Sequence, residues 1–159
     1  MSNPKSKIES LGVYLPDEVV TTEQVLAGCR TRPRWDLERI TGIKERRVAR
    51  GEFAADLAIK AARSALAMSK YKAEELGAVI CTSISKYNAP QEISFEPATS
   101  VLVRKAIGAR EALNFDIVNA CAGLMNGILL LDGMLKAGAI RCGMVVSGEF
   151  NTPLSETAQ

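Results

Sequence analysis

Apolar and polar residues follow two different periods along this chain, and the changes of period separate predicted strands from predicted helices. Apolar runs of strand length occur at ELGAVICTS (75–83), LNFDIVN (113–119) and CGMVVSGE (142–149). Runs without polar alternation are typical of strands buried on both faces of a parallel sheet. Helical patterns occupy the intervals at 52–70, 96–108 and 121–138. This alternation predicts an α/β fold with a mostly parallel sheet covered by helices on both faces.

The first fifty residues carry shorter elements. The pattern predicts an opening strand in KIESLGVYLP (7–16), ended by Pro16, and an extended KERRVA (44–49). Between them it predicts a helix that Thr21 or Thr22 caps, and a short helix in RPRWDLERITGI that ends at Gly42.

Two further features concern the later helices. A loop with Asn88 and Pro90 precedes the helix at 96–108, which has Pro97 in its predicted first turn. The helix after Cys121 is apolar nearly all round, which predicts a buried helix, with Gly123 and Gly127 on one face where another layer can approach closely. We therefore expect more layers than a sheet with two helical coats.

Composition narrows the class of protein. The 159 residues suffice for one domain, and 47% hydrophobic and 24% charged residues are typical of a globular protein. A net charge of +2 gives no indication of nucleic acid or an anionic membrane as partner. No apolar run reaches the length of a transmembrane helix, and the first ten residues lack the apolar region of a secretory signal. Four cysteines without a CxxC pair, and no histidine, predict no metal site and a cytoplasmic protein with reduced thiols.

Cys121 lies where a predicted strand meets a predicted helix. Backbone N–H groups and the helix dipole favour a thiolate there, and the same N–H groups can stabilise the oxyanion formed when the thiolate attacks a thioester. The residues leave two interpretations open: an acyl-accepting nucleophile, or a small buried core residue. We expect Cys81 and Cys142 to lie in the core, and Cys29 to be partly exposed near a helix end.

Four ordered motifs resemble a known family. NACAGLMNGI resembles the active-site cysteine segment of the thiolase superfamily, especially the 3-oxoacyl-ACP synthase III enzymes. Agreement in order comes from IESLGVYLPDEVVTTEQV, RWDLERITGIKERRVA and LKAGAIRCGMVVSGE. The resemblance implies a five-layer αβαβα sandwich of two similar halves, with residues 1–159 as the N-terminal half and Cys121 as the nucleophile. It also implies that a histidine and an asparagine from the second half complete the site, in line with the absence of histidine here.

The resemblance also implies roles for three other residues. Trp35 and Arg39 correspond to residues that contact the nucleotide end of coenzyme A. The alternative for Trp35 is a plain packing residue. For Arg39 the alignment has two versions: counting from Trp35 gives Arg39, whereas counting back from Gly42 gives Ile40 at this position. Glu96 stands where typical 3-oxoacyl-ACP synthase III enzymes have an apolar residue. It resembles the glutamate that head-to-head acyl-CoA condensing enzymes of olefin biosynthesis supply to a neighbouring subunit as a base. The alternative is a residue of the first helical turn that satisfies backbone N–H groups.

The activity implied is an acyltransferase that carries out a Claisen condensation. Cys121 would accept an acyl group from acyl-CoA, and malonyl-ACP would donate the attacking carbon. The alternatives are condensation of two acyl-CoAs with Glu96 as base, and a non-catalytic subunit that completes another chain's site. We expect no metal or redox cofactor. The expected partners are acyl-CoA, acyl carrier protein, and a C-terminal half or complementary chain in a homo- or hetero-oligomer. A nucleotide-binding domain is disfavoured, because neither GxGxxG nor GxxxxGK[ST] occurs.

Overall fold

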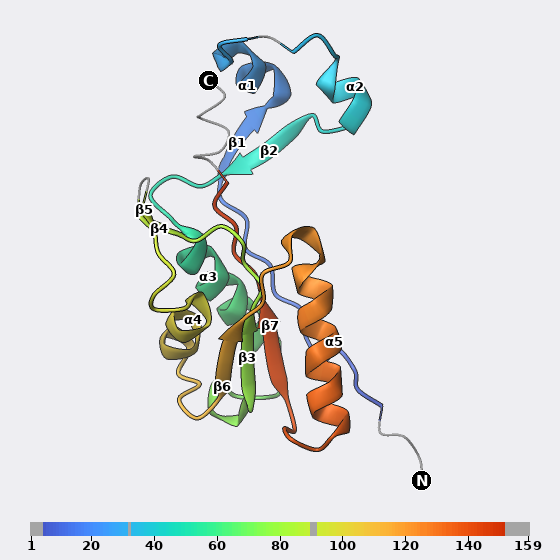
Figure 1. The fold of residues 1–159 in the computed structure, drawn as a ribbon, viewed down its shortest axis with the longest axis vertical. Helices are drawn as coiled ribbons and strands as arrows, with labels where there is room; N and C mark the ends of the chain where they lie inside the picture. Colours follow the sequence, from blue (N-terminus) through green and yellow to red (C-terminus); the bar gives the residue numbers. More distant parts are fainter. Residues whose placement is uncertain (1–4, 32, 90–91, 152–159) are drawn as a thin grey trace. The chain divides into compact units, whose positions relative to one another are not determined.

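The computed structural model describes residues 5–31, 33–89 and 92–151 (Figure 1). The chain forms two compact units. The first comprises Met1–Tyr14 and Phe53–Glu149, and the second comprises Leu15–Glu52 and Phe150–Gln159.

A three-stranded parallel sheet forms the centre of the first unit. Strands β3 (Ala78–Cys81), β6 (Leu113–Asp116) and β7 (Gly143–Val146) lie in the order β6-β3-β7. Helices α3 (Ala54–Ala67) and α4 (Thr99–Ile107) lie on one face and α5 (Gly123–Lys136) on the other (Figure 1). The predicted α/β fold with a parallel sheet is confirmed.

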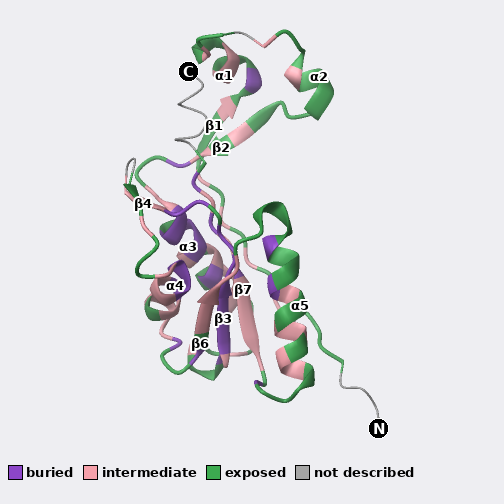
Figure 2. Ribbon diagram, in the orientation of Figure 1, coloured by how far each residue is buried: buried purple, intermediate pink, exposed green. Residues whose placement is uncertain are grey.

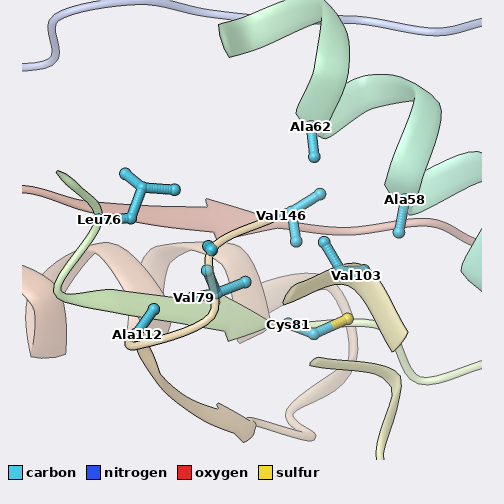
Figure 3. Packing of buried hydrophobic residues seen from close by; sticks show 9 residues of the cluster. Ala58, Ala62, Leu76, Val79, Cys81, Val103, Ala112 and Val146 are labelled. Carbon is cyan, nitrogen blue, oxygen red and sulfur yellow. The ribbon is translucent and has the colours of Figure 1, made fainter. Parts of the chain in front are cut away.

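Small side chains allow the helices to pack closely on this sheet. Figure 3 shows the core between the sheet and the pair α3 and α4, where Ala58 and Ala62 of α3 and Val103 of α4 meet Val79 and Cys81 of β3. Every residue of β3 is buried, as its continuous apolar run predicts. On the opposite face Gly127 of α5 lies over the sheet, where an added Cβ would come within 2.7 Å of Val145 Cγ1 and 2.9 Å of Thr82 Cγ2. Its predicted role as a close-approach residue is confirmed.

The prediction that α5 is buried is wrong for this chain. Most of α5 is exposed or half-buried (Figure 2). Only Gly123 and Gly127 are buried in this helix, while Met125 and Leu129 are 65% and 70% exposed. The physical reason is that α5 contacts the sheet through one side, which includes Gly127 and Leu131, whereas Met125 and Leu129 lie on its exposed side. No described residue of the chain covers this outer face.

The N-terminal segment differs from the predicted opening strand. Residues 5–16 are extended but pair with no strand in the described part of the chain. The segment packs against α3 through Gly12, where a Cβ would lie 2.1 Å from the backbone nitrogen of Ala65. Its alternating pattern therefore reflects one packed side and one exposed side, and the exposed side includes Leu11 and Val13.

The first unit also contains short elements around the sheet. A 3₁₀ turn, η1 (Ala73–Glu75), precedes β3, and a hairpin of β4 (Tyr87–Ala89) and β5 (Glu92–Ile93) precedes α4. The predicted loop with Asn88 and Pro90 falls in this region: Asn88 lies in β4, and Pro90 lies outside the described residues.

The second unit has an antiparallel pair of strands and two short helices. Strand β1 (Glu18–Thr21) pairs with β2 (Glu45–Val48), in agreement with the extended KERRVA, and helices α1 (Thr22–Gly28) and α2 (Leu37–Thr41) lie between them in sequence. Thr21 caps α1 in a capping box with Gln24, and Gly42 ends α2 at φ 72°. Among the helices of the described residues, none has the length and apolarity needed to cross a membrane.

Candidate nucleophile site

Cys121 lies on a strained turn between β6 and α5. It is the middle residue of η2 (Ala120–Ala122), and α5 begins two residues after it. Ala120 has φ 41°, a left-handed conformation that costs a residue with a Cβ roughly 1–2 kcal/mol. Such strain is concentrated at functional sites, because surrounding structure must enforce it. The turn therefore resembles the sharp elbows that present nucleophiles.

Hydrogen bonds close this turn on both sides. The Ala122 N–H donates to the Asn119 carbonyl at 3.0 Å, and Asn119 Nδ2 donates to Asn126 Oδ1 on α5 at 2.9 Å. Ala122, at the N-cap of α5, makes no side-chain cap bond. The Gly123 N–H donates to the Ala120 carbonyl, and no capping side chain occupies the N–H groups that follow it in the first turn of α5.

The four free cysteines differ sharply in accessibility. Cys121 is exposed, so its interpretation as a buried core residue is wrong. Cys81 is buried as predicted, and burial raises the pKa of its thiol. Cys142 precedes β7 and is partly exposed, but it packs against the core cluster, and burial raises the pKa of its thiol. Cys29 is partly exposed at the C-cap of α1, as predicted.

Two carboxylates occupy the carboxyl edge of the sheet. Asp116 ends β6, and Lys86 Nζ lies 2.6 Å from its Oδ2. Burial alone would raise the pKa of Asp116, but hydrogen bonds from Lys86 and Ser100 and the charge of Lys86 outweigh it and hold this pKa below its ordinary value. Beyond β7, Glu149 accepts hydrogen bonds from the Ser85 N–H at 2.9 Å and its Oγ at 2.6 Å. Both carboxylates therefore hold the chain that leaves β3.

Sequence reasoning missed these carboxylates. The available signal was a charged residue inside an apolar strand, since Asp116 interrupts LNFDIVN. A charge at such a position requires a partner, because an unpaired buried carboxylate is strongly unfavourable. That partner, Lys86, lies thirty residues earlier in a segment whose packing the sequence does not reveal.

Glu96 is exposed and precedes α4 rather than belonging to it. The N-cap of α4 is Ala98, so the prediction that the helix begins at 96 with Pro97 in its first turn is wrong. The alternative role of Glu96 as a first-turn residue that satisfies backbone N–H groups is also wrong, because Asp116 accepts the N–H groups of Thr99 and Ser100. The proposed role of Glu96 as a base is compatible with its accessible carboxylate.

Trp35 and Arg39 lie in the second unit, Trp35 just before the N-cap residue Asp36 of α2 and Arg39 within this helix. Trp35 is 72% exposed, so its alternative interpretation as a packing residue is wrong. The Arg39 side chain is exposed, while its backbone N–H donates to the Asp36 side chain at 3.0 Å and fixes the first turn of α2. Ile40, the alternative position, is 64% exposed. Both assignments to a coenzyme A contact remain predictions.

The described residues contain no group of three or more histidine, cysteine or acidic side chains that could hold a metal ion.

The chain is similar to enzymes named 3-oxoacyl-ACP synthase III. The β-ketoacyl-[acyl-carrier-protein] synthase III of Clostridium novyi (strain NT) is 38% identical over 143 residues, which cover 90% of this chain and 42% of the relative. The enzyme of the same name from Solibacter usitatus (strain Ellin6076) is 36% identical over 147 residues, with coverages of 92% and 42%. The chain thus spans about two-fifths of the length of the curated relatives it matches. No family model matches it.

Solved structures give the same result. The 3-oxoacyl-[acyl-carrier-protein] synthase III of Aquifex aeolicus VF5 has a TM-score of 0.82 and 31% identity, and the match covers 92% of this chain and 46% of that chain. Xanthomonas campestris OleA with bound cerulenin has a TM-score of 0.81 and 28% identity, with coverages of 93% and 45%. The chain is therefore similar to the 3-oxoacyl-ACP synthase III enzymes over about nine-tenths of its own length, and it has the thiolase-like fold that its motifs predicted.

Proposed function

We propose that this chain is the nucleophile-bearing part of a condensing acyltransferase of the 3-oxoacyl-ACP synthase III type. The observation that carries the proposal is the exposed Cys121 on a strained turn at the start of α5. The turn follows the carboxyl end of a parallel strand, which is where α/β proteins commonly place ligands. The similarity to synthase III enzymes over nine-tenths of the chain supports the same assignment.

The proposed reaction has two stages. The Cys121 thiolate attacks the carbonyl of an acyl-CoA, the tetrahedral oxyanion collapses, and coenzyme A leaves as a thiolate, so that a thioester forms on the cysteine. Malonyl-ACP then loses carbon dioxide, and the resulting carbanion attacks the acyl-cysteine carbonyl. The new carbon–carbon bond gives 3-oxoacyl-ACP, and the Cys121 thiolate is regenerated. Neither stage uses a metal or a redox cofactor.

An alternative second stage uses Glu96. The donor would then be a second acyl-CoA, and the Glu96 carboxylate would remove the proton next to its thioester carbonyl before carbon–carbon bond formation. Two observations support this alternative. Glu96 is exposed ahead of α4, and the structure of OleA matches this chain with a TM-score of 0.81. Because Glu96 resembles a residue that acts in a neighbouring subunit, this reaction also requires association.

The chain provides no histidine for proton transfer. We propose that residues 1–159 form the N-terminal half of the enzyme, and that a complementary half supplies the histidine and asparagine. The exposed apolar face of α5, with Met125 and Leu129, is a surface of the kind that such a half would cover. Acyl-CoA, acyl carrier protein and the complementary half are the proposed partners. Trp35 and Arg39 are the proposed contacts for the nucleotide end of coenzyme A.

Acylation tests the nucleophile directly. The chain is incubated with radiolabelled acyl-CoA, alone and together with the complementary half, and the labelled residue is identified by mass spectrometry. Label is expected on Cys121 only in the presence of the second half, and Cys121→Ala should remove it. Cys29→Ala is the matched control and should leave labelling unchanged. Rapid turnover by the 159-residue chain alone would refute the half-enzyme proposal, and label on another cysteine would refute the nucleophile.

Glu96→Gln separates the two versions of the second stage. If Glu96 is the base, the variant should form the acyl-enzyme at the wild-type rate but lose condensation of two acyl-CoAs by at least a hundredfold, within the range of general base catalysis. Glu92→Gln, which removes another exposed carboxylate of the same segment, serves as control. Condensation of two acyl-CoAs that survives in Glu96→Gln would exclude Glu96 as the base.

A further inference from the structure

A buried ion pair lies at the base of the segment between β3 and α4. Lys86 Nζ is 2.6 Å from Asp116 Oδ2, and the two side chains are only 5% and 15% exposed. Lys86 Nζ also lies 3.4 Å from Thr99 Oγ1. The pair is not part of the proposed chemistry, and charges are rarely buried without a specific reason.

Asp116 holds both ends of this segment at once. Its Oδ2 accepts from Lys86 at the beginning and from the Thr99 N–H at the end, at 3.1 Å, while Oδ1 accepts the Ser100 N–H at 2.8 Å. Thr99 and Ser100 are the first residues of α4, whose N-cap residue makes no side-chain cap bond. A carboxylate from β6 thus replaces the missing cap and fixes where α4 begins.

Between these fixed ends lies the arm, defined as β4, β5 and residues 94–98. The Ser94 N–H donates to the Lys86 carbonyl at 2.8 Å, and Ser94 Oγ donates to the Glu96 carbonyl at 2.9 Å. A continuous series of contacts therefore runs from Asp116 through Lys86 and Ser94 to Glu96.

The same aspartate connects the arm to the strand that leads to the nucleophile. Asp116 is the last residue of β6, and the N–H of the next residue, Ile117, donates to the Cys81 carbonyl at 2.8 Å. Cys121 follows four residues later. Movement of Asp116 relative to α4 would therefore change the position of Glu96 with respect to the sheet that supports the elbow.

We propose that Lys86 and Asp116 are positioning residues that set the place of the arm, and with it Glu96, relative to the parallel sheet of their own chain, so that Glu96 is held in one position for a neighbouring subunit. An apolar pair of the same size would fill the space without the free-energy cost of removing two charges from water. The Asp116 carboxylate instead accepts hydrogen bonds from the Lys86 ammonium and from the Thr99 and Ser100 N–H groups, and these bonds fix one geometry. The positioning role stands on the contacts alone, and its consequence for condensation rests on the proposed function.

Lys86→Met tests the proposal because it removes the charge and keeps most of the side-chain volume. Lys86→Arg keeps the charge and should rescue the effect. Lys105→Met removes an exposed lysine of α4 and is the matched control. Amide hydrogen exchange is measured on the 159-residue chain. In Lys86→Met the amides of residues 92–96, Thr99 and Ser100 should exchange at least tenfold faster, with those of β3, β6 and β7 unchanged.

The two reactions are measured on the chain combined with the complementary half. Lys86→Met should acylate Cys121 within twofold of wild type but lose at least tenfold in Glu96-dependent condensation of two acyl-CoAs. Unchanged exchange in the arm, or equally faster exchange in the whole sheet, would overturn the positioning role. Local loosening with unaffected condensation would overturn its consequence for catalysis. Absence of acylation in the wild type would refute the proposed function instead, and the exchange result would still decide the positioning role. If Lys86→Met does not fold, Lys86→Gln is used with the same expectations, since it keeps a hydrogen-bond donor without the charge.

Discussion

Gly12→Ala should detach the N-terminal segment from α3. A Cβ at this position would lie 2.1 Å from the Ala65 backbone nitrogen and 2.5 Å from the Ala61 carbonyl oxygen. These are backbone atoms of a helix, so no side-chain rotation can relieve the overlap. Overpacking costs about 1–3 kcal/mol, and the upper half of this range applies to a backbone contact. The smaller unfolded-state entropy of alanine returns about 0.4–1 kcal/mol. A net loss of about 2 kcal/mol corresponds to roughly 4–8 °C in Tm for a chain of this size.

Thermal unfolding followed by far-UV circular dichroism measures this loss. Val13→Ala is the matched control, because Val13 is the next residue and is 70% exposed, and its effect should stay within about 0.5 kcal/mol. A local readout is the amide of Lys70, which donates to the Glu9 carboxylate of the same segment at 3.1 Å. Its exchange should accelerate in Gly12→Ala. A Tm equal to that of Val13→Ala, with an unchanged Lys70 amide, would show that the contact between this segment and α3 is not close.

Two further predictions concern titration and thiol reactivity. Folding lowers the pKa of Asp116, so its contribution to the free energy of unfolding is complete above the ordinary value of 3.8 and is lost as pH falls through the folded-state pKa. In urea unfolding at a series of acidic pH values, the free energy of unfolding should therefore decrease less for Asp116→Asn than for wild type. Equal decreases would contradict the assigned hydrogen bonds. Maleimide labelling with peptide mass analysis should modify exposed Cys121 first and buried Cys81 only after denaturation, and early labelling of Cys81 would contradict the core.

The sequence was sufficient for the parts of the fold that depend on local patterns. Three apolar runs became β3, β6 and β7, and Gly127 marked the side of α5 that approaches the sheet. Prediction from the sequence failed where the structure of a segment depends on which other segment packs or pairs with it. A strand needs a partner for its backbone groups, and 7–16 has none among the described residues. The same limitation affected α5, whose apolar character indicates that its surface needs covering but cannot say what covers it.

The candidate site shows the same division. A motif located Cys121, and the exposed thiol on a turn with Ala120 at φ 41° agrees with it. The pairing of Lys86 with Asp116 was missed, because it joins residues thirty positions apart and no periodic pattern records such a contact. Resemblance suggested a role for Glu96, and the structure added the contacts through which its position could be controlled.

The exposed apolar side chains of α5 begin within one helical turn of the nucleophile. Leu124 and Met125 follow Cys121 by three and four residues, and they are 45% and 65% exposed. A partner that covered these side chains would also remove water from around the start of α5, where backbone N–H groups interact more strongly with a negative charge as the local dielectric falls. Covering the apolar face and strengthening the anion-stabilising N–H groups would then be consequences of the same association. This reasoning can be tested with a variant of the proposed complementary half that lacks its histidine. With this variant, the rate of Cys121 acylation should be lower than with the unmodified half but higher than for the chain alone.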